Sequence, residues 1–150
     1  MSDTLTQWQQ IWKDLQQIGI AYALTAVIGW DREAEAHSAG LRTFPIVGMA
    51  SCGYLLALGG QANSADQSRV LQGLITGIGF VGGGAILKEG TTVRGTATAA
   101  SVWNAGVIGA SVAMGRYEIA VLLAALNLLT LRALLPLKLW IDKRGSPDAK

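Results

Sequence analysis

The sequence predicts an all-α integral membrane protein: a small bundle of about five transmembrane helices with an amphipathic interfacial helix at the N-terminus. Two observations carry this prediction. Hydrophobic residues make up 51% of the 150 residues and charged residues only 15%. The charges also stand in short clusters, and several of the uncharged stretches between them are long enough to span ~30 Å of hydrocarbon at about 1.5 Å per residue.

Residues 1–17 are predicted to form an amphipathic helix lying in the outer membrane interface. Its apolar face repeats at helical spacing through Leu5, Trp8, Trp12 and Leu15. Glutamines and Lys13–Asp14 fill the other face, and tryptophan favours the interface because its ring is amphipathic. A water-exposed extension of the first span is the alternative.

The membrane domain is predicted over residues 18–141, with spans at about 18–30, 44–60, 70–87, 96–115 and 119–135. The first span is the least apolar, so four spans are the alternative. Pro45 suits the first turn of a helix, and Pro136 follows the last span. Arg132 within that span is expected to snorkel towards the interface. Residues 142–150 are predicted to be a disordered cytoplasmic tail.

The basic residues predict the orientation. With five spans, one side of the membrane receives Lys13, Arg69 and Arg116. The other side receives nine basic residues, namely Arg32, Arg42, Lys88, Arg94, Arg132, Lys138, Lys143, Arg144 and Lys150. Since cytoplasmic loops carry an excess of Lys and Arg, the N-terminus is predicted outside and the C-terminus in the cytoplasm.

A cluster of charged residues falls on this predicted cytoplasmic face: Asp31, Arg32, Glu33, Arg42, Lys88, Glu89 and Arg94. These residues are either solvated loop charges or an ordered group of ion pairs under the helix ends, in which Arg32 reaches a carboxylate or a lipid phosphate. His37 is the only histidine, which argues against a transition-metal site. A hard-cation site using Asp31, Glu33 or Glu35 stays open, so metal binding is unknown, and no cofactor is implied.

The third predicted span is rich in glycines that are expected to pack helices together: Gly73, Gly77, Gly79, Gly82, Gly83 and Gly84. GxxxG spacing lets backbones approach closely in lipid. The run 82–84 also suggests a loosened helix, which is typical of transporters. Residues 77–82 match the dinucleotide pattern G-x-G-x-x-G but lack its strand and acidic residue, so no nucleotide is expected.

One polar residue, Asn104, lies near the middle of the fourth predicted span. An unpaired amide in hydrocarbon is costly, so its side chain should face the bundle interior. The lone Cys52 in the second span is expected to be a small buried apolar residue.

Three segments together carry a family resemblance: GWDRE (29–33), AGLRT (39–43) and GLITGIGFVGGGAILKEGTTVRGTATAASVWNAGVIG (73–109). They resemble the MgtC/SapB family of bacterial inner-membrane proteins, and the seven cluster residues match the family's charged motif positions. The resemblance implies a multi-pass inner-membrane protein linked to low magnesium, acid stress and survival of pathogens inside macrophages. Longer members carry a soluble domain after the last span, so this chain is expected to be a short form.

Two functions follow as expectations. The first is a non-enzymatic regulatory or interaction protein whose glycine faces dock a partner helix or a second copy. The second is an oligomeric transporter or channel for Mg²⁺ or another cation. No Ser–His pairing or pair of buried carboxylates suggests an enzyme. The net charge of +2, without a basic stripe, argues against nucleic acid. The expected partners are the lipid bilayer, another inner-membrane protein and a second copy of the chain.

Overall fold

The structure is a computed structural model that describes the backbone of residues 2–34, 39–59, 63–90 and 92–145. In these ranges the chain forms five helices and one hairpin: α1 (Ser2–Ala34), α2 (Thr43–Ala57), α3 (Ser64–Gly84), β1 (Leu87–Glu89), β2 (Thr92–Arg94), α4 (Thr96–Ala113) and α5 (Tyr117–Gly145). The strands pair antiparallel, with Lys88 opposite Val93. The predicted all-helical class is confirmed, and the hairpin adds a small piece of sheet.

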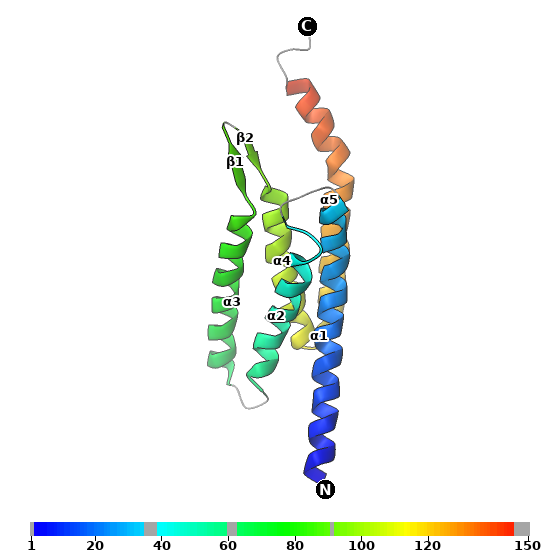
Figure 1. Ribbon diagram of the computed structural model, residues 1–150, viewed down its shortest axis with the longest axis vertical. Helices are drawn as coiled ribbons and strands as arrows, with labels where there is room; N and C mark the ends of the chain where they lie inside the picture. Colours follow the sequence, from blue (N-terminus) through cyan, green and yellow to red (C-terminus); the bar gives the residue numbers. More distant parts are fainter. Residues whose placement is uncertain (1, 35–38, 60–62, 91, 146–150) are drawn as a thin grey trace.

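The helices run up and down along one axis, so α1 and α5 place the two chain termini at opposite ends of the molecule (Figure 1). The C-terminal end of α1, the start of α2, the β-hairpin and the C-terminal end of α5 lie towards the same end. Helix α4 is central and contacts all four other helices. The topology therefore brings the segments of the predicted charged cluster to one end of the bundle.

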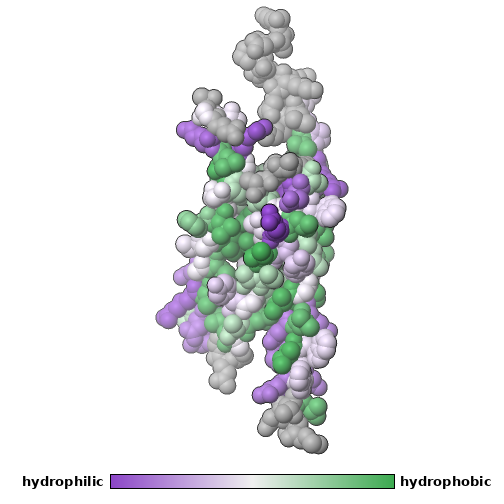
Figure 2. Space-filling model, viewed as in Figure 1, coloured by the Kyte–Doolittle hydropathy of each residue, from purple (hydrophilic) through white to green (hydrophobic). Residues whose placement is uncertain are grey.

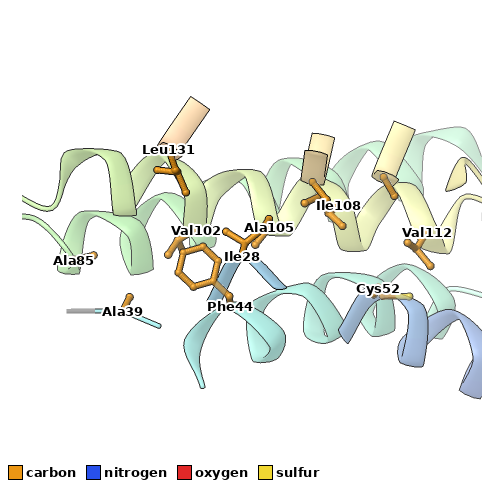
Figure 3. Close-up of a cluster of buried hydrophobic side chains, with 13 residues drawn as sticks. Ile28, Ala39, Phe44, Cys52, Ala85, Val102, Ala105, Ile108, Val112 and Leu131 are labelled. Atoms are coloured by element: carbon orange, nitrogen blue, oxygen red, sulfur yellow. The ribbon is translucent and has the colours of Figure 1, made fainter. Parts of the chain in front are cut away.

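The core forms around α4. Phe44 of α2 lies against Ile28 of α1 and Val102 of α4, with Leu131 of α5 nearby (Figure 3). Full burial of an aromatic side chain such as Phe44 contributes about 1.5–3 kcal/mol in a soluble protein. In lipid, such contacts act through van der Waals packing instead.

Close helix contact depends on glycines of α2 and α4. A Cβ atom at Gly109 would lie against the backbone carbonyl oxygen of Gly48, closer than real Cβ atoms come. A Cβ at Gly48 would come within 2.5 Å of the Thr25 hydroxyl oxygen of α1. These glycines lie outside the run that the sequence pattern selected, and they hold α1, α2 and α4 together.

The N-terminal segment differs from the prediction of a separate interfacial helix. Residues 2–17 continue without a break into the predicted first span, and α1 is one helix of 33 residues. No proline interrupts it, and a single helix-interior glycine such as Gly19 costs only about 1 kcal/mol. Residues 2–17 therefore extend the first helix, which is the arrangement that the alternative interpretation describes.

Helix α3 is shifted towards the N-terminus relative to its predicted range of 70–87. It begins at Ser64, where the Asn63 side chain accepts a hydrogen bond from the Asp66 backbone N–H at 2.9 Å. It ends at Gly84, so the triple glycine terminates the helix and does not loosen its middle. Gly90 and Gly95, at the turn and the exit of the hairpin, have φ of 61° and 86°, which favour glycine.

Helix α5 extends beyond its predicted end at residue 135. It continues through Pro136 to Gly145 and into the tail that was predicted to be disordered. Proline has no backbone N–H, so one helix hydrogen bond is missing at Pro136, and the helix continues on both sides of it. Residues 146–150 of that predicted tail lie outside the described residues.

One helix of the described chain, Tyr117–Pro136 in α5, is long and apolar enough to cross a membrane, and α2 is apolar but shorter. Only 11% of that α5 segment is buried, whereas the core helix of a soluble protein would be mostly covered. On the face shown in Figure 2, apolar side chains cover much of the surface between the two ends, with a few hydrophilic side chains among them. The prediction of five spans goes further than this finding.

Candidate functional site

An ion-pair triad with two buried members, Asp31 and Arg32, and one exposed member, Arg132, connects α1 to α5. Asp31 accepts a hydrogen bond from the Arg32 guanidinium at 2.6 Å and another from the Arg132 guanidinium at 2.7 Å. The Asp31 and Arg32 side chains are 5% and 3% exposed, whereas that of Arg132 is 71% exposed. We call Asp31, Arg32 and Arg132 the Asp31 triad.

The two arginines keep Asp31 ionised. Burial by itself raises the pKa of Asp31, but hydrogen bonds and charge attraction from Arg32 and Arg132 outweigh burial and leave the pKa below its usual value. The triad carries two positive charges and one negative charge. The triad is therefore an ordered group of ion pairs. At this position it favours the interpretation of the cluster as ion pairs under the helix ends over that of solvated loop charges.

The other predicted cluster residues occupy two places. Glu33 accepts a hydrogen bond from the Leu41 backbone N–H at 3.0 Å, which ties the end of α1 to the segment before α2. Arg42 precedes α2 and is exposed, without a side-chain capping bond. The basic hairpin residues Lys88 and Arg94 are exposed.

The side chain of Glu89 lies outside the described residues, and so do Glu35 and His37.

Arg132 is the residue of the triad that the sequence interpretation missed. It was expected to snorkel towards the interface, and its side chain is 71% exposed, but its guanidinium also pairs with a carboxylate 101 positions away in the chain, which was not predicted. The signal was present: an arginine inside an otherwise apolar span is costly, and a buried acidic partner is the usual compensation.

One of the six α3 glycines that were expected to pack helices together packs against the described chain itself. A Cβ at Gly82 would come within 3.0 Å of the Ala99 carbonyl oxygen of α4, so Gly82 is an internal packing position. At the remaining five, an added Cβ would meet nothing within 4 Å: Gly73, Gly77, Gly79, Gly83 and Gly84. Glycine is not required at those positions by anything within the described chain.

Two of these open glycines line a groove. Gly73 and Gly77 of α3 face Ile46, Ala50 and Tyr54 of α2 across an apolar cavity of about 600 Å³. Phe80 follows on the same helix face at 86% exposure, and Gly84 continues that face. This α3 face, formed by Gly73, Gly77, Phe80 and Gly84, is a strip of small residues around one large apolar side chain.

Polar side chains connect α4 to α5 in the bundle interior. Asn104 donates its amide N–H to the Leu123 carbonyl oxygen at 3.3 Å, so it faces a neighbouring helix as predicted. Ser101 donates to the Asn127 side-chain oxygen at 2.9 Å. The Thr98 hydroxyl oxygen and the Asn127 amide nitrogen are buried without a hydrogen-bond partner among the described residues.

The described residues hold no group of three or more His, Cys, Asp or Glu side chains that could bind a metal ion directly. Residues 77–82, the dinucleotide-like pattern, lie wholly inside α3. A phosphate-binding turn between a strand and a helix is therefore not formed by that pattern.

Comparison with known proteins places the chain among its relatives. The sequence profile of the MgtC family matches residues 18–140. The chain belongs to the MgtC family. The family resemblance of the three sequence segments is thereby confirmed, and membrane association of the family agrees with the apolar helix α5.

Several curated proteins are similar over much of this MgtC-family chain. An uncharacterized protein of Synechocystis, slr0014, is 32% identical over 91% of this chain and 57% of its own length. The putative magnesium transporter YhiD of Escherichia coli is 32% identical over 75% of this chain and 56% of its own. Protein MgtC of Salmonella typhimurium is 35% identical over 65% of this chain and 42% of its own.

The chain thus spans about half the length of the curated relatives it matches. No solved structure matches it.

Proposed function

We propose that this MgtC-family chain is a non-enzymatic regulatory or interaction protein of the bacterial inner membrane. It docks a partner transmembrane helix, or a second copy of itself, on the α3 face. One observation carries this proposal: two of the open glycines of α3, Gly73 and Gly77, line an apolar groove, while other glycines pack the bundle. In lipid, such a face gains contact area when another backbone approaches.

The membrane placement in this proposal is multi-pass, with five helices crossing, the N-terminus outside and the C-terminus in the cytoplasm. Large apolar side chains are exposed on every helix, including Trp30, Tyr54, Phe80, Trp103 and Leu129. A soluble protein rarely exposes so extended an apolar surface, whereas lipid covers it without cost. The count of three basic residues against nine supports the orientation.

The physiological setting is adaptation to low magnesium, acid or intracellular stress. That setting is implied by the family resemblance, and one relative carries the name putative magnesium transporter.

The test replaces the glycines of the groove. Gly73→Leu and Gly77→Leu place side chains in open space, so the fold is expected to survive while the groove is filled. Crosslinking in cells should then yield fewer adducts with a partner protein or with a second copy of the chain. Growth at low magnesium should decline in the same variants. Gly53→Leu in α2 is the matched control, since its Cβ also meets nothing within 4 Å. Unchanged crosslinks and growth in both groove variants would refute the proposal.

A second function, an oligomeric transporter or channel for Mg²⁺ or another cation, is supported by a different observation. Among the described residues, the Thr98 hydroxyl and the Asn127 amide nitrogen are buried without partners beside the Ser101–Asn127 hydrogen bond. Intramembrane polar groups of this kind often line ion or water paths. Saturable Mg²⁺ uptake into proteoliposomes, reduced by Asn127→Leu, would favour this function. An absence of flux from folded protein would leave the first proposal.

A further inference from the structure

Arg132, the exposed member of the Asp31 triad, is held in place by a single donor. A guanidinium has five N–H donors, and the Nε–H of Arg132 donates to the Asp31 carboxylate at 2.7 Å. Among the described residues, neither terminal nitrogen of Arg132 makes a hydrogen bond. The exposed side chain therefore presents two terminal nitrogens, with their N–H donors, to whatever lies beside α5.

The Asp31 carboxylate neutralises Arg132 only in part. It also accepts a hydrogen bond from the buried Arg32 at 2.6 Å, so one negative charge is shared between two guanidinium groups. The start of α2 and strand β1 lie towards the same end of the bundle (Figure 1), and they carry the exposed Arg42 and Lys88. The charge at this end favours an anionic ligand, and Arg132 offers that ligand unused donors.

Two features place Arg132 near the level of the lipid headgroups. The apolar segment of α5 ends at Pro136, and Arg132 precedes that end by ~6 Å at about 1.5 Å per residue. On α1, the exposed Trp30 directly precedes Asp31, and tryptophan gathers where hydrocarbon meets headgroups. A long arginine side chain at this depth reaches the lipid phosphates.

An apolar stripe of α5 leads from Arg132 towards the middle of the apolar segment. Leu129, Ala125 and Val121 precede Arg132 at helical spacing, so they lie on the same face of the helix. All three are exposed. The stripe is ~17 Å long at about 1.5 Å per residue, which is about half of the ~30 Å of hydrocarbon and matches one leaflet. We call it the α5 stripe.

A cation above an apolar stripe complements a phospholipid. The planar fork of arginine matches two phosphate oxygens and binds them bidentately. A free phosphate ion meets the same donors but gains no contact with the α5 stripe. A lipid with net negative charge gains both, and it also supplies the charge that Asp31 provides only in part.

We propose that Arg132, oriented by Asp31, binds the phosphate of an anionic phospholipid whose acyl chain lies along the α5 stripe. This site uses the membrane placement of α5 and does not depend on docking at the α3 face. Either proposal can therefore fail while the other stands.

Native mass spectrometry of the purified full chain, titrated in detergent with phosphatidylglycerol, measures the affinity of the bound lipid. Arg132→Gln should weaken binding about tenfold, the order expected when a charge-assisted hydrogen bond is lost. Arg132→Lys keeps the charge but lacks the fork, so it should also weaken binding. Arg42→Gln is the matched control, because it removes the same charge from another exposed arginine and should leave binding unchanged.

Competition identifies the source of the phosphate. Phosphatidylcholine with the same acyl chains has no net charge and should bind more weakly, and millimolar inorganic phosphate should not displace the lipid. Four results would overturn the proposal: equal binding of the two lipids, displacement by inorganic phosphate, unchanged binding in both Arg132 variants, or equal weakening by Arg42→Gln and Arg132→Gln. Circular dichroism of each variant checks that the helices are retained.

Discussion

Removing the shared carboxylate of the Asp31 triad should destabilise the protein far more than removing its exposed arginine. Asp31→Asn keeps the size of the side chain but takes the negative charge away from the buried Arg32 guanidinium, which is 3% exposed. Breaking a buried pair on one side costs about 3–5 kcal/mol. Arg132 is 71% exposed, so Arg132→Gln should cost no more than about 1 kcal/mol.

Equilibrium unfolding of the detergent-solubilised protein, followed by tryptophan fluorescence, measures both costs. The double variant Asp31→Asn with Arg132→Gln should be about as stable as Asp31→Asn alone, because the second change removes an interaction that is already lost. Equal costs for the two single variants, or additive costs in the double variant, would refute the reasoning that burial of Arg32 dominates the triad.

Three further predictions concern packing, pH and the hairpin. Gly109→Ala should destabilise the bundle by about 1–3 kcal/mol or more through overpacking against Gly48. Gly77→Ala should instead raise the unfolding free energy by about 0.5–1 kcal/mol, because its Cβ meets open space and alanine is the better helix former; the same unfolding assay compares them. The pKa of Asp31 is lowered in the folded state, so the triad stabilises the fold above the ordinary Asp pKa of about 3.9. That stability is lost as the pH falls through the lower folded pKa, and acid titration should show this loss in the wild type and not in Asp31→Asn. Gly95→Ala should weaken the hairpin by about 1 kcal/mol or more, because alanine is strained at φ 86°, and faster amide hydrogen exchange in β1 and β2 would report it.

The helices and the charged end of the bundle could be predicted from local patterns, because uncharged runs and basic clusters are properties of neighbouring residues. The partner of Asp31 could not, since Arg132 is 101 positions away and its pairing depends on how α5 lies beside α1. The sequence interpretation selected Arg32 and left Arg132 as a solitary snorkelling charge. Only the charge inside an apolar run marked it.

The glycines are a second case in which a local sequence pattern did not predict a contact between distant parts of the chain. GxxxG spacing in α3 predicted close packing, but spacing does not say what lies opposite each glycine. Gly82 meets α4, while Gly73 and Gly77 face an open groove. The internal contacts use Gly48 of α2 and Gly109 of α4 instead, and neither belongs to a glycine run or a GxxxG pair that would mark it. Which glycines pack inside the chain is decided by tertiary geometry.

In the multi-pass placement proposed above, the unequal lengths of the helices would set the height at which the molecule sits in a bilayer. Helix α1 has 33 residues and α5 has 29, which correspond to ~50 and ~44 Å at about 1.5 Å per residue, against ~30 Å of hydrocarbon. Figure 1 shows that α1 overhangs the bundle at one end and α5 at the other. Since the Asp31–Arg132 ion pair ties the two helices together, one cannot slide along the membrane normal without the other. A bilayer that thins or thickens would therefore strain both overhangs at once, and the protein would prefer membranes of one thickness.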